Sequence, residues 1–239
     1  MHLYQYILLF TSIAGGGLLA FVLRDKIQGY LQLILSFSGA YIVGITALHL
    51  IPETFEHSGE YKLGLWLLLG FFGQLLLDQL STGLEHGHIH AAHKANASFA
   101  IKVMVGLCIH SFIEGMPLSA ISHVHNHANH QPHLFWGIVL HEVPASFALS
   151  TLLLMSGYRQ KIVLLCLVTY ASMSSLGALT VSFLQPNAEI SKVLMAVVIG
   201  SFLHISTTIL FEADSSHHIS VRKLLAILIG LSMALISLT

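Results

Sequence analysis

Residues 98–121 read SFAIKVMVGLCIHSFIEGMPLSAI. This stretch is apolar over a length that can cross a bilayer as a helix, for which about 20 residues are needed. Within it lie His110 and Glu114, whose side chains are costly to place in hydrocarbon. A second apolar run, 133–156, contains His141-Glu142-Val143-Pro144. Because ionisable groups at such depth mark functional sites, the two runs predict a membrane-spanning fold and the place of its site.

Eight stretches of the chain are long and apolar enough to span a membrane as helices. Short polar connections separate them, and no linker marks off a second domain. We therefore expect an all-α integral membrane protein in which residues 1–239 form a single bundle of eight transmembrane helices. The expected spans are about 4–23, 31–51, 62–80, 98–121, 133–156, 160–184, 190–211 and 221–238.

The composition agrees with a membrane protein. Hydrophobic residues make up 55% and charged residues 9% of the chain, and the mean hydropathy is +0.78; a soluble domain has about 25% charged residues. The net charge of -1 predicts no nucleic-acid partner. Cys108 and Cys166 lie in apolar runs without a CxxC motif, which argues against a disulfide framework or a thiolate zinc site. No basic segment precedes the first apolar run, so we expect no cleaved signal peptide.

The Lys and Arg residues predict the orientation of the bundle. Connections after the odd-numbered spans hold eight of these residues, and connections after the even-numbered spans hold two. By the positive-inside rule the first set faces the cytoplasm, which puts both termini on the extracytoplasmic side. The two sets are Arg24, Lys26, Lys94, Lys102, Arg159, Lys161, Arg222 and Lys223, against Lys62 and Lys192.

Histidine is unusually frequent, with 17 residues against 10 Lys and Arg. Many of these histidines fall in two loops. The HxHxH spacing in these loops favours weak metal-collecting sites over polar loops that happen to use histidine. The predicted cytoplasmic loop contains His86, His88 and His90, and the predicted external loop contains His123, His125, His127, His130 and His133.

The two intramembrane clusters are predicted to meet. His110 and Glu114 are spaced i,i+4 and share a helix face, with Ser111 beside it. Counted from the outer helix ends at 1.5 Å per residue, Glu114, His110 and His141 lie at depths of about 10, 16 and 12 Å. If the two antiparallel helices pack side by side, His141 therefore falls between the other two. Pro117 and Pro144 are expected to kink these helices and to free carbonyl groups near the site.

A single buried His or Glu is more often a hydrogen-bonded or packing residue than a ligand. Four such groups at matched depth favour a pathway for a metal ion or for protons. The histidine-rich loops favour the metal, for which imidazole and carboxylate are suitable ligands. Glu142 is either a direct ligand or a residue that orients an imidazole. The predicted metal residues are His110, Ser111, Glu114, His141 and Glu142.

Three further polar residues are candidates for entry or exit of the ion. His49 and Glu53, again spaced i,i+4, lie at the outer end of the second span and form either an entry site or an interfacial polar pair. His204 lies inside the seventh span and either lines the pathway or bonds to a neighbouring helix.

The chain resembles the ZIP family (Zrt/Irt-like proteins) of divalent metal transporters. His110-Ser111-Phe112-Ile113-Glu114-Gly115 is similar to the family's fourth-span motif His-Asn/Ser-x-x-Asp/Glu-Gly. His141-Glu142-Val143-Pro144 is similar to the start of its fifth-span motif, and Ala47-Leu48-His49-Leu50-Ile51-Pro52-Glu53 also looks like the family.

The resemblance implies uptake of zinc, and in some members of iron, manganese or cadmium, toward the cytoplasm. It also implies a homodimer that works by alternating access, without ATP and without a prosthetic group. Members commonly carry a further Glu, or a His-Glu pair, after the fifth-span proline, where this chain has Ala145 and Ser146. We therefore expect one metal ion in the central site.

We predict a transporter and not an enzyme, in the cell (inner) membrane, that takes up zinc through a His/Glu site between spans 4 and 5. The main alternative is an intramembrane zinc-dependent hydrolase with an activated water as nucleophile. Against it, His141-Glu142 is not followed by the second His of HExxH. A metal sensor is a further alternative, but the sequence contains no soluble output domain.

Overall fold

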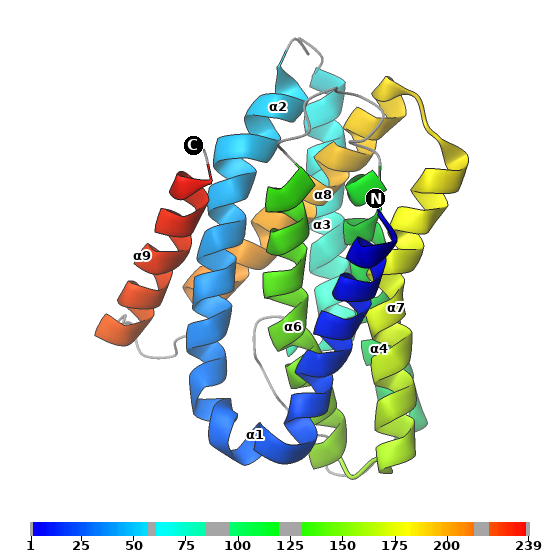
Figure 1. Ribbon diagram of the computed structural model, residues 1–239, viewed down its shortest axis with the longest axis vertical. Coiled ribbons are helices and arrows are strands. Elements are labelled where there is room, and N and C mark those ends of the chain that lie inside the picture. Colours follow the sequence, from blue (N-terminus) through cyan, green and yellow to red (C-terminus); the bar gives the residue numbers. More distant parts are fainter. Residues whose placement is uncertain (1, 57–60, 85–95, 120–130, 213–219, 238–239) are drawn as a thin grey trace.

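The computed structural model describes residues 2–56, 61–84, 96–119, 131–212 and 220–237, and every regular element within these ranges is a helix (Figure 1). The all-α prediction is therefore confirmed for this part of the chain. The elements are α1 (Leu3–Ile45), the π-helical turn η1 (Thr46–Leu50), α2 (Ile51–Phe55), α3 (Tyr61–Ser81), α4 (Ala97–Gly115), α6 (Gln131–Met155), α7 (Gln160–Leu184), α8 (Ala188–Glu212) and α9 (Val221–Ile236).

Seven segments of the described residues are long and apolar enough to cross a membrane. The predicted eighth span, 221–238, corresponds to α9, which has 16 residues. At 1.5 Å per residue α9 extends about 24 Å, less than the bilayer core of about 30 Å. An eighth span and the side on which the termini lie therefore stay predictions. The seven segments are Leu3–Leu23, Tyr30–Phe55, Lys62–Ser81, Ala97–Ser119, His133–Met155, Gln160–Leu184 and Ala188–Phe211.

The first two spans belong to one helix, whereas the sequence predicted a break between them. α1 is assigned as helical from Leu3 to Ile45, and its ribbon reverses direction between two arms (Figure 1). No proline lies between the arms, and most residues there are compatible with a helix. Hydropathy places the two spans correctly because it detects the apolar arms, but it does not show whether the backbone between them stays helical.

The fourth span, which runs from Ala97 to Ser119 among the described residues, contains an irregular turn. α4 ends at Gly115, and the Met116 N–H donates to the carbonyl of Ile113 at 3.2 Å, a tighter i→i−3 bond. Met116 keeps helical dihedral angles, and residues 117–119, which begin with Pro117, are helical again. Glu114 therefore lies in the last turn of α4, next to the point where the regular helix stops.

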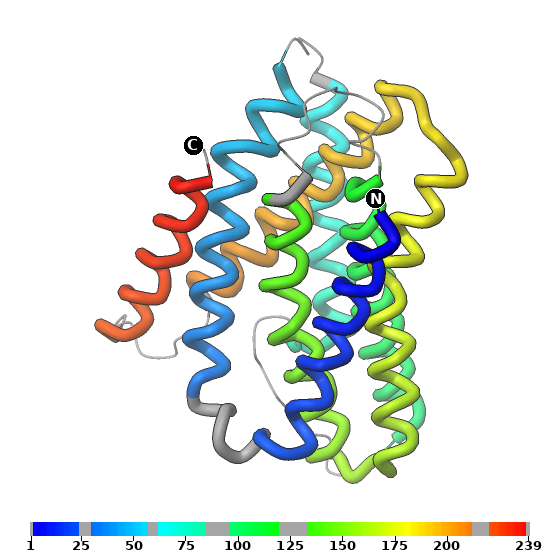
Figure 2. The backbone as a smooth tube through the Cα atoms, in the orientation of Figure 1, coloured from blue at the N-terminus to red at the C-terminus, as the bar shows by residue number. Residues whose placement is uncertain are grey.

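Glycines allow the helices of the bundle to approach closely. α1 packs against α6 and α9, α3 packs along α8, and α4 packs along α7. A Cβ on Gly177 of α7 would collide with the Phe112 carbonyl of α4, and one on Gly115 would collide with Ser174. Small residues at helix contacts are the usual way in which membrane helices pack tightly. Figure 2 shows α9 at one edge of the bundle, and α6 is the most enclosed of the spans.

Candidate metal centre

One face of α4 presents two of the predicted ligands. His110 and Glu114 are one helical turn apart, as their spacing predicted, and His110 Nε2 lies 3.4 Å from Glu114 Oε2. The side chains of both are buried. Because α4 ends one residue after Glu114, the carboxylate is held at the end of a regular helix and beside the Met116 turn.

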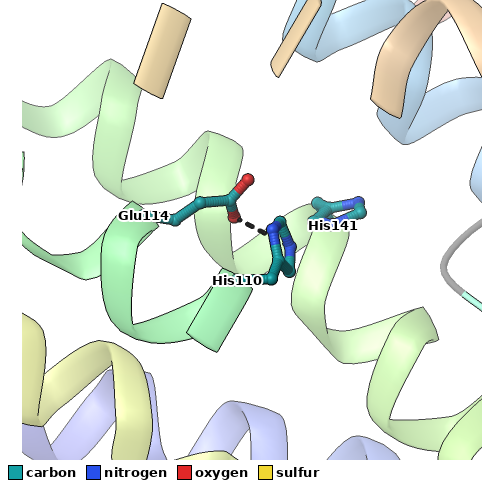
Figure 3. A group of neighbouring side chains, drawn as sticks. All are labelled: His110, Glu114 and His141. Carbon is teal, nitrogen blue, oxygen red and sulfur yellow. Dashed lines mark ion pairs between the residues drawn. The ribbon is translucent and has the colours of Figure 1, made fainter. Parts of the chain in front are cut away.

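α6 supplies the third predicted ligand, His141, from the opposite side. The His141 ring meets the His110 ring edge to face, with centroids 5.6 Å apart and an interplanar angle of 89°. Figure 3 shows the His110, Glu114 and His141 side chains gathered between α4 and α6. A ligand atom of each lies within 4.8 Å of the others, and among the described residues these three form the group of His, Cys, Asp and Glu compact enough to hold a metal ion. The expected meeting of the two clusters is present in the structure.

The spacing of this group suits a small divalent cation. Two ligand atoms on a tetrahedral zinc ion with bonds of about 2.1 Å lie about 3.4 Å apart. That value agrees with the 3.4 Å between His110 Nε2 and Glu114 Oε2. His141 offers a third ligand atom, within 4.8 Å of the other two. Its exposed fraction is 0%, that of Glu114 is 0% and that of His110 is 1%, so an ion bound there would be enclosed by protein.

Ser111 and Glu142 lie in a hydrogen-bonded cluster of their own. The Ser174 hydroxyl of α7 donates to Glu142 Oε1 at 2.5 Å, and its oxygen lies 2.7 Å from the Ser111 hydroxyl. The two hydroxyls therefore share a hydrogen bond beside the Glu142 carboxylate. The structure thus brings these two predicted ligands to each other, through a serine to which the sequence assigned no role.

Gln74 is a second residue that the sequence analysis did not identify. It lies on α3, and its Oε1 is 3.0 Å from His110 Nδ1 and 3.2 Å from the Ser201 hydroxyl of α8. The run 62–80 is mostly apolar, and an amide inside it, here Gln74 or Gln79, is the sequence signal that could have indicated such a role. The central site is therefore contacted by α3 through Gln74, which is bonded in turn to Ser201 of α8.

The predicted outer site lies at a turn of unusual geometry. His49 falls in the π-helical turn η1, a type of turn often found at functional sites. His49 Nε2 lies 3.1 Å from the Ser237 hydroxyl, and its ring stacks on that of His133 at 5.0 Å. His49 and Glu53 line one open hollow of about 660 Å³. The structure brings these two together and adds His133 from the predicted external loop.

The other entry or exit candidates lie apart from the central group. The His204 side chain on α8 is buried and meets the Phe71 ring edge to face, with centroids 5.1 Å apart. It is not a member of the three-residue cluster. His86, His88 and His90, and the external loop histidines other than His133, lie outside the described residues.

The region that carries the central ligands matches a known family. The model of a family described as ZIP Zinc transporter matches residues 85–237, more than half of the chain. The chain belongs to the ZIP zinc transporter family. Together with its seven apolar helices, this membership makes it a multi-pass membrane protein.

Individual relatives of this ZIP family member include three ZIP9 proteins. It is 29% identical over 170 residues to Zinc transporter ZIP9-A of Xenopus laevis, which covers 66% of this chain and 54% of the relative. It is 28% identical over 165 residues to Zinc transporter ZIP9 of Xenopus tropicalis, and the alignment covers 64% of this chain and 53% of that relative. It is 27% identical over 175 residues to Zinc transporter ZIP9 of Micropogonias undulatus, and the alignment covers 68% of this chain and 56% of that relative. The chain spans about half the length of the curated relatives it matches.

This chain departs from the expected ZIP pattern on α6, at Ala145 and Ser146. Ala145, one turn after His141, is buried and offers no ligand atom. The Ser146 hydroxyl donates to the carbonyl of Val143 in its own helix at 2.8 Å. The Ser146 hydroxyl is thus used within the helix, and α6 presents no further carboxylate one turn after its histidine.

Proposed function

We propose that this chain is a divalent metal ion transporter that carries Zn²⁺ toward the cytoplasm through His110, Glu114 and His141. The proposal rests above all on one observation: two imidazoles and a carboxylate meet, buried, between two apolar helices. Membership of a zinc transporter family and similarity to ZIP9 proteins support it. Zinc is here the cargo and no prosthetic group is needed, while Fe²⁺, Mn²⁺ and Cd²⁺ are further candidate cargoes because the same ligand types bind them.

The site offsets the main obstacle to moving a cation through a bilayer, the loss of its water. An isolated charge in hydrocarbon is strongly unfavourable, whereas one that is paired with a carboxylate and coordinated by imidazoles is tolerated. Coordination requires neutral imidazoles and an ionised carboxylate, so metal binding competes with protons. The Glu114 carboxylate supplies one negative charge, which leaves the zinc complex with a net positive charge and favours release once a path opens.

In our proposal Glu142 and Ser111 stabilise the surroundings of this site. They become ligands themselves only if their hydrogen bonds rearrange. Glu142 follows His141 directly and is tied to α7 by the Ser174 hydroxyl. A change of partner would allow its carboxylate to reach the ion. With Ala145 and Ser146 offering no further ligand, we expect one metal ion and not two.

The outer hollow and the histidine-rich loops are the proposed ends of the pathway. His49 and Glu53 would receive the ion at the hollow that they line. His86, His88 and His90 would receive it on the cytoplasmic side, and His204 would line the route between. These sites must bind weakly, because a tight site at either end would trap the ion. The excess of Lys and Arg on one set of connections supports an orientation in which those connections face the cytoplasm. Uptake across the cell (inner) membrane is part of the proposal. We expect a homodimer.

An intramembrane zinc hydrolase is the alternative, and the site favours it less. A hydrolase needs a metal-bound water with a base placed to take its proton. The neighbouring carboxylate outside the three-ligand group, Glu142, accepts a hydrogen bond from Ser174. The family match also points to transport.

A transport assay under opposed zinc gradients separates the two functions. Purified protein in liposomes should equilibrate zinc down its gradient in either direction, and should leave labelled peptide and ester substrates intact. Zinc-dependent hydrolysis without zinc movement would establish the alternative. His2→Ala, which alters an exposed histidine, serves as the matched control for substitutions in the site.

A further inference from the structure

A buried hydrogen-bond chain joins the central site to two helices that carry none of its ligands. Gln74 Oε1 on α3 lies 3.0 Å from His110 Nδ1 and also accepts from the Ser201 hydroxyl of α8 at 3.2 Å. The exposed fractions of Gln74, His110 and Ser201 are 2%, 1% and 4%. A polar group at this depth needs a partner, and here the partners are arranged around one oxygen atom.

Glycine packing fixes the position of that oxygen. A Cβ added to Gly70, one turn before Gln74, would collide with the Val197 carbonyl of α8. A Cβ added to Gly200, next to Ser201, would collide with the Leu67 carbonyl of α3. The two helices are thus in close backbone contact within about two turns of the Gln74–Ser201 bond, which fixes where Gln74 lies beside His110.

The amide oxygen determines which nitrogen of His110 carries the proton. An amide oxygen only accepts hydrogen bonds, so the Nδ1 that faces it must be the protonated nitrogen of the neutral ring. The lone pair then lies on Nε2, which points toward Glu114 Oε2 at 3.4 Å. In the opposite tautomer the hydrogen lies on Nε2 and is donated to Glu114. His110 and Glu114, two of the three proposed ligands, would then bond to each other and not to the ion.

We infer that Gln74 is a positioning residue, which acts by holding His110 in the Nδ1–H tautomer with Nε2 ready for a divalent cation. The inference rests on the proposed transport function. Metal-binding histidines usually have such a partner, and its loss typically lowers metal affinity about 10- to 100-fold. A neutral amide also raises the basicity of the ring less than a carboxylate does, which suits a site that must release its ion.

Two substitutions at Gln74 separate positioning from packing. Gln74→Met keeps the length of the side chain and removes the acceptor, so the zinc dissociation constant should rise about 10- to 100-fold. Gln74→Glu keeps an acceptor for Nδ1–H, so zinc should bind at least as tightly as in the wild type while the maximal uptake rate falls. Gln32→Met, the same change at an exposed position of α1, is the matched control and should change neither value. A packing role predicts instead that Gln74→Met, which keeps the length of the side chain, binds zinc as tightly as the wild type, and that result would overturn the inference.

A spectroscopic measurement tests the same point without relying on a variant that folds. In the metal-free wild type, the imidazole ¹⁵N shifts of His110 should report a proton on Nδ1 and none on Nε2. A proton on Nε2 overturns the inference.

If His110→Ala keeps normal zinc uptake, the proposed function itself fails. If His110→Ala loses uptake while Gln74→Met binds zinc like the wild type, the positioning role alone fails.

Discussion

The His110 ring of α4 meets the His141 ring of α6 edge to face, with centroids 5.6 Å apart. These residues are 31 positions apart in the chain by their numbering, and they come from different apolar helices. Their contact, with Glu114 beside them, turns two sequence motifs into one buried ligand group. A rearrangement that separates α4 from α6 would take this group apart, which makes the pairing suited to a site that binds and then releases an ion.

Zinc uptake should depend on pH through these imidazoles. A protonated imidazole has no lone pair for a metal, so protons and zinc compete for the same nitrogen. As the pH falls, apparent zinc affinity should therefore fall, by up to about tenfold per pH unit for each imidazole that must lose a proton. The measurement is initial uptake against zinc concentration in liposomes with equal pH inside and outside. A KM that stays constant between about pH 7.5 and about pH 5.5 contradicts imidazole coordination.

Removing the hydroxyl that holds Glu142 should destabilise the protein. Ser174→Ala removes the donor to Glu142 Oε1 and leaves a buried acceptor without it. The expected loss is about 1–3 kcal/mol of unfolding free energy, seen as a lower Tm in detergent. Ser172→Ala is the control, since the Ser172 hydroxyl donates to Val168 of its own helix. That variant should stay within about 0.5 kcal/mol of the wild type, and equal Tm values for both variants would refute a supporting role for Ser174.

A methyl group added at the α4–α7 contact should also destabilise the protein. Gly177→Ala places a Cβ against the carbonyl of Phe112, so the two helices must move apart. Overpacking of this kind costs about 1–3 kcal/mol. Gly73→Ala makes the same change where no atom lies within 4 Å of the added Cβ, and it should be neutral or slightly stabilising. The comparison needs only two thermal unfolding curves. A Gly177→Ala variant as stable as Gly73→Ala would show that the close contact does not matter.

The outer hollow should affect capture of zinc and not its passage. His49→Ala removes an imidazole beside Glu53 at the proposed entry. We expect the KM for zinc uptake to rise several-fold and the maximal rate to stay unchanged, because the central ligands are intact. Concentration series for the wild type and the variant measure both quantities. A lower maximal rate with an unchanged KM would place His49 in the transport step and not at the entrance.

Hydropathy predicted seven of the helical spans, and the spacing and depth of the polar residues predicted that His110, Glu114 and His141 lie together. Apolar runs and i,i+4 pairs are local properties of a sequence, which is why they can be read without a structure. Glu142 shows why the rest was harder to predict. Adjacent residues on a helix point about 100° apart, so His141 faces α4 while Glu142 meets Ser174 of α7. Gln74 acts through a contact between α3 and α4 that depends on how glycines pack α3 on α8, and no pattern along the chain encodes that contact. Hydropathy likewise could not predict that the backbone between the arms of α1 is helical.

The most direct test of the account is uptake of radiolabelled zinc into liposomes that contain the purified chain, with His110→Ala and His2→Ala beside the wild type. His110 is both a predicted ligand and the residue at the centre of the buried cluster. We expect saturable uptake by the wild type and by His2→Ala, and background uptake by a folded His110→Ala protein. Wild-type uptake by folded His110→Ala would contradict the claim that the ion passes through this site.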